Sequence, residues 1–301
     1  ILHSKVNFIE VLDECGEGVP PRGLSQSDWE ADEIVEDNAP AEAIYVSVGA
    51  GVVFDDFCDW AAKEGLWGAE NLSYIPGEVG ASAIQNIGAY GVEVKDIIHK
   101  VYCYDTLEEE FVHFSVEECG YGYRDSIFKK PEVKGRYIVT HVVFALSREP
   151  KPQLGYGQLH ESVMAAVGTS DITPAAIRKV IIKIRKEKLP EPSVMGSAGS
   201  FFMNPVVTKK VAESLAEEYP TMPKYPLPNG DVKLSAGWLI EKCGWKDTPH
   251  EHVGVYQHQA LVVINRGNAT GQDVLDFASA VVASVKEKFG VALNMEVNVI
   301  E

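Results

Sequence analysis

Short apolar runs separated by polar residues occupy the first half of the chain. Residues 44–48, 100–104 and 137–144 are rich in valine, isoleucine and tyrosine, which favour extended backbone, and each run predicts a β-strand. Between the first two runs the spacing of apolar residues becomes helical. We expect one helix there, capped at its start by Asp55 and ended by Gly65.

Apolar residues recur every three or four positions through much of the second half, which predicts helices. The first begins at Thr173, a cap followed by proline at the first helical position, and ends before Pro190. Further helices are expected over residues 208–215, 235–243 and 272–289, and a final strand over 291–300. The apolar stripe of the last helix comprises Leu275, Ala278, Val282, Val285 and Phe289. This mixture indicates an α/β or α+β architecture, with a domain boundary near residues 150–156.

The length of 301 residues and the hydrophobic content of 46% indicate a globular protein with two domains. No membrane span or signal peptide is predicted, since the longest apolar runs, such as residues 260–264, are far too short for a bilayer. The five cysteines are widely spaced and none forms a C-x-x-C pair. This pattern favours a reducing cytoplasm and argues against a disulfide framework or a metal site.

The net charge of −17 is concentrated near the start of the chain. Residues 10–42 hold 11 acidic residues and one arginine, together with several prolines and glycines. We interpret the stretch at about 16–41 as a solvated acidic loop; a docking surface for a basic partner is the alternative. A chain with this charge is not expected to bind nucleic acid.

A glycine-rich segment over residues 74–94 is the first candidate for chemistry. Its glycines flank the pair Gln85-Asn86, and glycine allows positive φ and close approach of the backbone to a ligand. Successive backbone N–H groups in such a loop form an anion site, which suits a cofactor that carries phosphates. The spacing matches neither the dinucleotide fingerprint nor the P-loop, so two ordinary turns explain the glycines alone equally well.

Three residues elsewhere in the chain are candidates for catalysis. Arg124 offers a fork of donors that fits a carboxylate, although a surface turn is the alternative. Ser200 lies in A-G-S-F-F without a nearby histidine base, so it suits proton donation better than nucleophilic attack; a loop hydrogen bond is the alternative. Glu296 lies in the predicted final strand and matters only if that strand returns to the site.

Six segments of the chain carry a resemblance that no single motif provides. They read YIPGEVGASAIQNIGAYGVEV at 74–94, GYRDSIFK at 122–129, IRKEKLPEP at 184–192, GSAGSFFMNPVV at 196–207, KLSAGWLIEKCGWK at 233–246 and HQALVVIN at 258–265. In their order and spacing, over about residues 42–301, they resemble the UDP-N-acetylenolpyruvoylglucosamine reductase family. So many segments in one order make the resemblance specific.

The resemblance implies an α+β fold with two domains. Residues 1–150 correspond to an FAD-binding domain of the vanillyl-alcohol-oxidase/PCMH type, and residues 151–301 to an α+β substrate-binding domain whose last strand returns to the active site. Family members begin with additional residues that bind the FAD pyrophosphate, so we expect this chain to lack the N-terminal part of the FAD domain.

The implied reaction belongs to peptidoglycan precursor synthesis in the cytoplasm. FAD accepts hydride from NADPH and passes it to the enolpyruvyl ether of UDP-N-acetylglucosamine, and the neighbouring carbon is protonated to give UDP-N-acetylmuramate. Small molecules are the only partners implied, and the enzyme is expected to be a monomer.

The resemblance also assigns roles to residues of this sequence. Ser200 is the expected general acid, and Arg124 and Glu296 are expected to stabilise the enolate and fix the substrate carboxyl group. Binding of the nucleotide sugar is expected from Tyr156, Lys188, Asn204 and Gln259. Binding of FAD is expected from Ile75, Pro76, Gly77, Gly80, Ser82, Gln85, Asn86 and Gly88.

The sequence departs locally from the family pattern, and two other functions are alternatives. Met203 and Asn298 stand where the family often has basic residues, which weakens the expected binding of anions. Another flavin oxidoreductase of the same superfamily, such as a sugar or alcohol oxidase, would react with oxygen and would not need Arg124. A nucleotide-sugar binding module would bind UDP-sugars without flavin.

Overall fold

The computed structural model describes residues 5–12, 43–168, 172–191, 193–246 and 251–299. The chain folds into two compact units, Ile1–Lys183 and Ile184–Glu301. The acidic stretch predicted at 16–41 lies outside the described residues. The predicted division into a cofactor domain over 1–150 and a substrate domain over 151–301 concerns function and stays a prediction.

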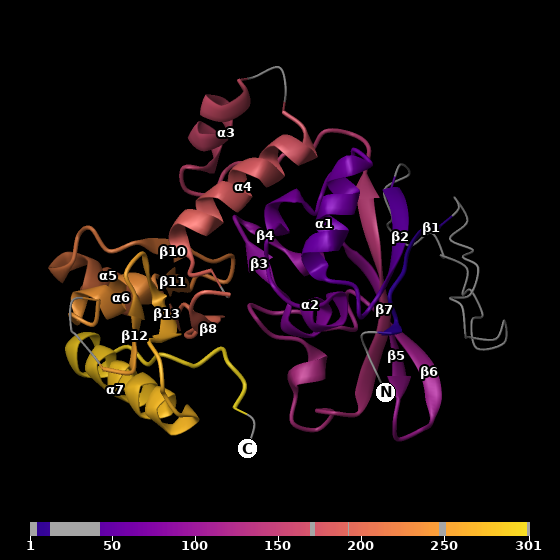
Figure 1. Cartoon of the computed structure of the whole chain (residues 1–301). Coiled ribbons are helices and arrows are strands. Elements are labelled where there is room, and N and C mark those ends of the chain that lie inside the picture. Colours follow the sequence, from indigo (N-terminus) through magenta and orange to yellow (C-terminus); the bar gives the residue numbers. More distant parts are fainter. Residues whose placement is uncertain (1–4, 13–42, 169–171, 192, 247–250, 300–301) are drawn as a thin grey trace. The chain divides into compact units, whose positions relative to one another are not determined.

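A five-stranded antiparallel sheet forms the centre of the first unit (Figure 1). Its strands lie in the order β1 (Ile9–Val11), β2 (Ala43–Gly49), β7 (Tyr137–Ser147), β5 (Ile98–Asp105) and β6 (Glu110–Ser115). The three strands predicted from the apolar runs are confirmed as β2, β5 and β7, and they are neighbours in the middle of the sheet. Their apolar residues are those that the sheet must bury, and Val46, Val101 and Phe144 have no exposed surface.

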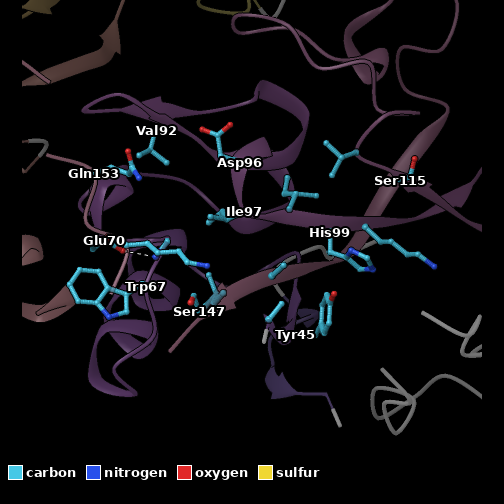
Figure 2. A pocket seen from close by; sticks show the side chains of 18 of the residues that line it. Tyr45, Trp67, Glu70, Val92, Asp96, Ile97, His99, Ser115, Ser147 and Gln153 are labelled. Atoms are coloured by element: carbon cyan, nitrogen blue, oxygen red, sulfur yellow. Dashed lines mark hydrogen bonds between the residues drawn. The ribbon is translucent and has the colours of Figure 1, made fainter. Parts of the chain in front are cut away.

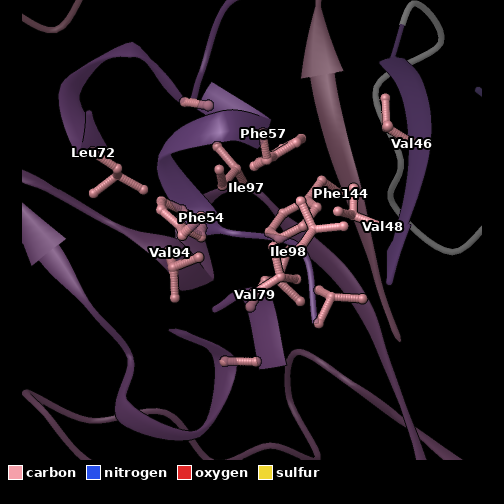
Figure 3. Packing of buried hydrophobic residues seen from close by; sticks show 14 of the residues in the cluster. Val46, Val48, Phe54, Phe57, Leu72, Val79, Val94, Ile97, Ile98 and Phe144 are labelled. Atoms are coloured by element: carbon pink, nitrogen blue, oxygen red, sulfur yellow. The ribbon is translucent and has the colours of Figure 1, made fainter. Parts of the chain in front are cut away.

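Two helices cover one face of this sheet and close the first core (Figures 1 and 3). They are α1 (Phe54–Lys63) and α2 (Val79–Gln85). Phe57 of α1 stacks on Phe144 of β7, with ring centroids 4.4 Å apart, and neither side chain is exposed. Full burial of a phenylalanine contributes about 1.5–3 kcal/mol, so this pair anchors α1 on the sheet.

The start of α1 differs from the prediction, whereas its end is as expected. Val53 is the N-cap residue, and Asp55 lies in the first turn of the helix. The carboxylate of Asp55 accepts hydrogen bonds from the amide of Tyr74 and the guanidinium of Arg178 instead of capping. An acidic residue in the first turn still stabilises the helix dipole. The helix stops before Gly65, which adopts a φ of +71°.

Two more helices follow the sheet, α3 (Leu159–Val167) and α4 (Pro174–Lys188). The predicted cap of α4 is confirmed, because the amide of Ala176 donates to Thr173 Oγ1 at 3.1 Å. The first compact unit contains α3 and all of α4 up to Lys183, so both helices belong mainly to the unit that holds the five-stranded sheet.

Within the glycine-rich segment, β3 (Gly88–Ala89) and β4 (Val92–Glu93) form a hairpin with a two-residue loop. Tyr90 and Gly91, at its tip, adopt φ values of +50° and +84°. Positive φ at both tip residues is the geometry of a type I′ turn, which favours asparagine and glycine and disfavours tyrosine. The unit also contains 3₁₀ turns at Glu70–Leu72, Val94–Asp96 and Ile127–Lys129.

The described part of the second unit contains two three-stranded sheets and the helices α5, α6 and α7. One sheet has the order β12 (Val253–Tyr256), β13 (Gln259–Asn265), β8 (Gly196–Ser200), and the other β10 (Lys224–Pro226), β11 (Val232–Leu234), β9 (Val206–Val207). The helices are α5 (Lys209–Glu218), α6 (Ala236–Lys242) and α7 (Gly271–Phe289). The strand pairs described in both units are antiparallel, which confirms the predicted α+β class.

The last helix and the segment after it correct two predictions. The side of α7 that is buried consists of Phe277, Ala278, Val281, Val285 and Phe289, whereas Leu275 and Val282 are only partly buried. Both stripes are apolar in sequence, and packing selects between them. The strand predicted over 291–300 is wrong as far as the chain is described, to residue 299: a single bridge joins Met295 to Phe202, and no ladder forms.

Candidate active site

The glycine-rich segment is a turn followed by a short helix rather than one open loop. Gly77 adopts a φ of +111°, and a Cβ added there would meet nothing within 4 Å. The amides of Val79 and Gly80 donate to the carbonyls of Val52 and Ala50, each at 2.9 Å. These two amides are therefore engaged within the protein, and the accessible backbone lies at the turn before α2.

Polar side chains of this segment are bonded to neighbouring segments of the first unit. Ser82, on α2, donates from Oγ to a carbonyl of its own helix at 2.6 Å. Gln85 Oε1 accepts from Lys129 Nζ at 2.8 Å. Asn86 is buried, with a left-handed φ of +47°, and its Nδ2 donates to the carbonyl of Gly122 at 2.8 Å. These side chains fix the shape of the segment to which they belong.

Arg124 is held against the same segment. It adopts a φ of +56° in a tight turn closed by two backbone hydrogen bonds between Gly122 and Asp125. Its guanidinium donates to the carbonyls of Asn86, at 3.1 Å, and Gly88, at 2.8 Å. The side chain is 15% exposed. The structure thus brings a predicted catalytic residue to two predicted cofactor residues.

Two residues around Arg124 escaped the sequence analysis. A carboxylate oxygen of Glu93, on β4, lies 3.7 Å from Arg124 Nη1, and Glu93 also accepts from Asn86 Nδ2 at 3.3 Å. Lys129 Nζ donates to the backbone carbonyl of Arg124 at 2.6 Å. Both residues lie inside segments that carry the resemblance, but no local spacing shows that the chain folds them around a guanidinium.

Gly88 is the position where the backbone and Arg124 approach most closely. A Cβ added to this glycine would lie 2.9 Å from the carbonyl oxygen of Val92 and 3.0 Å from Arg124 Nη1. Contacts this short with a backbone atom are not found for real side chains, so only glycine fits. The position of the Arg124 guanidinium against the carbonyls of Asn86 and Gly88 therefore depends on the absence of a side chain at residue 88.

Tyr156 lies in the first compact unit, beside the β3–β4 hairpin. Its ring meets that of Tyr90 edge to face, with centroids 6.0 Å apart and an interplanar angle of 83°. A Cβ added to Gly91 would lie 3.5 Å from the Cβ of Tyr156. The Tyr156 side chain is 49% exposed, so one side of this ring is accessible.

In the second unit, Glu296 bonds through its backbone to the residue that follows Ser200. Ser200 is exposed at the end of β8, opposite Val262 of β13. The amide of Glu296 donates at 2.9 Å to the carbonyl of Phe201, the residue after Ser200. The amide of Met203 donates in turn to Asn294, also at 2.9 Å. The backbone of the final segment therefore runs beside residues 201–203, next to Ser200, without forming a strand, and its place in an active site stays a prediction.

The other predicted substrate residues of the second unit lie around the start of α6 or on α4. Asn204 Oδ1 accepts from the amide of Ala236 at 2.9 Å, at the first residue of α6. Gln259 Oε1 accepts from the amide of Leu261 at 3.4 Å and would lie 3.1 Å from a Cβ added to Gly237. Lys188 is exposed at the last residue of α4.

A cavity of about 880 Å³ in the first unit involves none of the predicted site residues (Figure 2). Trp67, Glu70, Tyr45 and His99 are among the residues that line it. Burial raises the pKa of Glu70, whose carboxylate accepts from the amide of Gly68 at 2.6 Å, and burial lowers the pKa of His99. These shifts reflect desolvation near the sheet and point to no reaction.

Family models match both parts of the chain. Residues 191–300 match a model described as the C-terminal domain of UDP-N-acetylenolpyruvoylglucosamine reductase. Residues 31–114 match a model described as an FAD binding domain.

Individual relatives cover most of the chain. It is 47% identical over 300 residues to the UDP-N-acetylenolpyruvoylglucosamine reductase of Bacteroides fragilis. The aligned residues cover 100% of this chain and 81% of that protein. The enzyme of the same name from Alcanivorax borkumensis is 46% identical over 253 residues, 84% of this chain and 72% of that protein. A crystal structure of UDP-N-acetylenolpyruvylglucosamine reductase from Thermus caldophilus aligns with a TM-score of 0.56 and 25% identity, over 84% of this chain and 71% of that one. No helix in the described part of the chain combines the length and apolarity needed to cross a membrane.

Proposed function

Because the chain belongs to the UDP-N-acetylenolpyruvoylglucosamine reductase family, as its six segments predict, we propose that it reduces the enolpyruvyl ether of UDP-N-acetylglucosamine to UDP-N-acetylmuramate. Hydride comes from NADPH through FAD, and the product serves peptidoglycan precursor synthesis in the cytoplasm. The match to an FAD binding domain supports the cofactor assignment. The observation that carries the proposal is the anchoring of Arg124 by carbonyls of the glycine-rich segment.

The glycine-rich segment fits a flavin in its backbone geometry. The open turn at Gly77, where an added Cβ would meet nothing within 4 Å, allows a planar ring or a phosphate to approach the main chain closely, and Gly88 lets Arg124 pack against the same segment. We propose that Ile75, Pro76, Gly77, Gly80, Ser82, Gln85, Asn86 and Gly88 hold FAD, largely through backbone groups. Bound FAD would supply the hydride for the enol ether.

Ser200 acts as the general acid in this proposal. Hydride addition to the enol ether leaves negative charge delocalised over the neighbouring carbon and the carboxylate, and that carbon must receive a proton. The hydroxyl of Ser200 is exposed at the end of a strand, where it is able to donate. General acid catalysis typically contributes about 10²–10⁴ in rate.

Arg124 and Glu296 stabilise the charge that develops before protonation. The guanidinium of Arg124 is fixed by two carbonyls, so it needs little reorganisation when the substrate carboxylate gains enolate character. Glu296 is tied by its backbone to Phe201, next to the proposed acid. Loss of one such electrostatic group typically lowers kcat by about 10²–10³.

Four residues bind the nucleotide sugar in the same proposal. Tyr156 covers the diphosphate with its accessible ring, and Lys188 supplies a positive charge for it. Asn204 and Gln259 form amide hydrogen bonds with the substrate. The carbonyl oxygen of Asn204 accepts from the amide of Ala236 and that of Gln259 from the amide of Leu261, which fixes the orientation of their NH₂ groups.

A Ser200→Ala variant tests the proposal in two half-reactions. With FAD bound, NADPH should bleach the flavin absorbance at the wild-type rate, because no proton reaches a carbon in that step. Turnover of the enolpyruvyl ether should fall by about 10²-fold or more. Wild-type turnover in the variant would remove Ser200 from the mechanism, and a wild-type protein that neither binds FAD nor reduces the ether would overturn the function.

A further inference from the structure

We propose that Asn71 is a positioning residue for the nucleotide-sugar substrate, acting through Tyr156. The inference rests on the proposed function, which gives Tyr156 the substrate diphosphate. Asn71 itself lies in the 3₁₀ turn Glu70–Leu72, is 1% exposed and reaches no ligand directly. Nothing in the sequence pattern singles it out.

The amide of Asn71 joins two segments that are far apart in the chain. Its Nδ2 donates to the carbonyl of Tyr90 at 3.0 Å and to the carbonyl of Gln153 at 2.7 Å. Both hydrogens of one NH₂ group are therefore used to hold the tip of the β3–β4 hairpin against the segment that leads to Tyr156. Hydrogen bonds in such buried surroundings fix geometry strongly, because water cannot replace them.

One polar atom of the Asn71 side chain is left unsatisfied in this arrangement. Its Oδ1 is buried and has no hydrogen-bond partner among the described residues. A buried acceptor without a partner destabilises the folded protein and so reduces the net stability that the two donated bonds provide. These two bonds nevertheless fix the positions of the Tyr90 and Gln153 carbonyls relative to each other.

The hairpin tip needs an external support because its backbone is strained. Tyr90 adopts a φ of +50°, a conformation that costs a residue with a side chain about 1 kcal/mol or more. The ring of Tyr90 meets the ring of Tyr156 edge to face at 6.0 Å, and Gly91 lies against the Tyr156 Cβ. Asn71 thereby fixes the two segments that flank Tyr156: the hairpin beside its ring and the stretch of chain that precedes it.

A double-mutant cycle on the holoenzyme distinguishes positioning from a general structural role. The variants are Asn71→Leu, Tyr156→Ala and the double variant, and the measured quantities are kcat and the KM for the enolpyruvyl ether. Asn71→Leu should raise this KM about 5–20-fold, as expected for loss of about 1–2 kcal/mol of substrate binding, with kcat changed less than about 2-fold. In the Tyr156→Ala background the same substitution should change KM by less than about 2-fold, because its effect passes through the missing ring.

Ser73→Ala is the matched control. Ser73 lies directly after the same 3₁₀ turn, is fully buried and donates to the carbonyl of Glu70 at 2.6 Å rather than to Tyr90 or Gln153. Its loss should lower the unfolding midpoint and leave KM unchanged. If Asn71→Leu fails to fold, Asn71→Ser completes the cycle, since its short side chain cannot span both carbonyls.

The outcomes separate this inference from the proposed function. A wild-type protein without turnover of the enolpyruvyl ether overturns the function and this inference with it. An active wild-type protein in which Asn71→Leu and Tyr156→Ala multiply their effects on KM, or in which Asn71→Leu leaves KM within about 2-fold, overturns the positioning role alone.

Discussion

Gly88 shows how much of the proposed chemistry depends on a single residue. A methyl group at this position would require the carbonyl of Val92 to move and would press on Arg124 Nη1. We therefore expect Gly88→Ala to displace the guanidinium and lower kcat/KM for the enolpyruvyl ether about 10²-fold, since small misplacements of catalytic groups cost this much. Steady-state kinetics and a urea titration test this, with a loss of stability of about 1–3 kcal/mol expected from overpacking.

Gly271→Ala provides the comparison for Gly88→Ala. Gly271 begins α7, and an added Cβ there meets nothing within 4 Å. The substitution should leave kcat/KM unchanged and increase stability slightly, because alanine is the better helix former. Equal kinetic effects of the two substitutions would show that the crowding around Arg124 has no consequence for the reaction.

His141 is expected to make the first unit sensitive to acid. Burial lowers its pKa to about 3, and its ring stacks on Tyr102 with centroids 4.2 Å apart. The unfolded chain takes up a proton near pH 6.5 and the folded protein only near pH 3, so the stabilising contribution is complete above 6.5 and is lost as the pH falls toward 3. Between pH 7 and 5 this costs about 2 kcal/mol. Urea unfolding of His141→Phe should show a flatter dependence on pH, and an unchanged slope would contradict the assignment.

Residue identity alone predicted the catalytic candidates but not their supports. Ser200, Arg124 and Glu296 belong to segments whose letters carry the family resemblance. Asn71 bonds to the carbonyls of Tyr90 and Gln153, and Glu93 lies beside Arg124. These contacts form only when the hairpin folds. Asp55 shows the same limit, because its sequence position suits a cap, whereas Arg178 and Tyr74 compete successfully for its carboxylate.

At the scale of elements, Arg178 links α4 to α1. Arg178 is 8% exposed and donates to Asp55 and to Asp59, the latter at 3.2 Å. Removing the arginine leaves the carboxylates of Asp55 and Asp59 with only the amide of Tyr74 and the exposed Lys63 as partners among the described residues. We expect Arg178→Met to lower the free energy of unfolding by about 2–4 kcal/mol, near the range found for broken buried pairs, as measured by urea titration.

Lys63→Ala is the matched test of that ion-pair cluster. Lys63 also pairs with Asp59, but its side chain is 74% exposed. Water screens such a pair, so the substitution should change stability by less than about 1 kcal/mol. A loss as large as that of Arg178→Met would mean that burial does not determine the strength of these ion pairs.

Periodicity predicted helices and central strands well because each buries one repeating face. Periodicity gave the wrong answer where one sequence pattern was compatible with two different packing arrangements. The apolar residues of α7 form two overlapping stripes, and only the packing of the second unit selects the side that includes Phe277 and Val281. Residues 294–296 alternate like a strand, yet they bond to 201–203 without a ladder. Such choices depend on tertiary contacts, which a single sequence does not contain.

For the whole molecule, composition predicted two compact units, and each has a separate apolar core. The first is built around Phe57 and Phe144, and the second around Leu239 and Val281. Composition placed the change of domain near residues 150–156, whereas the units divide within α4, at Lys183. The helices α3 and α4 resemble those of the second half in spacing, and only their packing assigns residues 151–183 to the first unit.

Separate cores predict that damage to one unit stays in that unit. Leu66 is 1% exposed in the first core, and Leu239 is fully buried in the second. Truncation of either leucine to alanine costs about 2–5 kcal/mol, because the lost contacts leave a cavity. Amide exchange reports the opening of each cooperative part of a protein separately. We expect Leu239→Ala to accelerate amide exchange in α6, α7 and β13 by about 10²-fold, which corresponds to a loss near ~3 kcal/mol. Exchange in β2, β5 and β7 should not change.

Leu66→Ala should give the reverse pattern. If either substitution accelerated exchange equally in both groups of elements, the two cores would open in one cooperative step. The destabilisation expected from Gly88→Ala and Arg178→Met would then extend to the segment that carries Ser200.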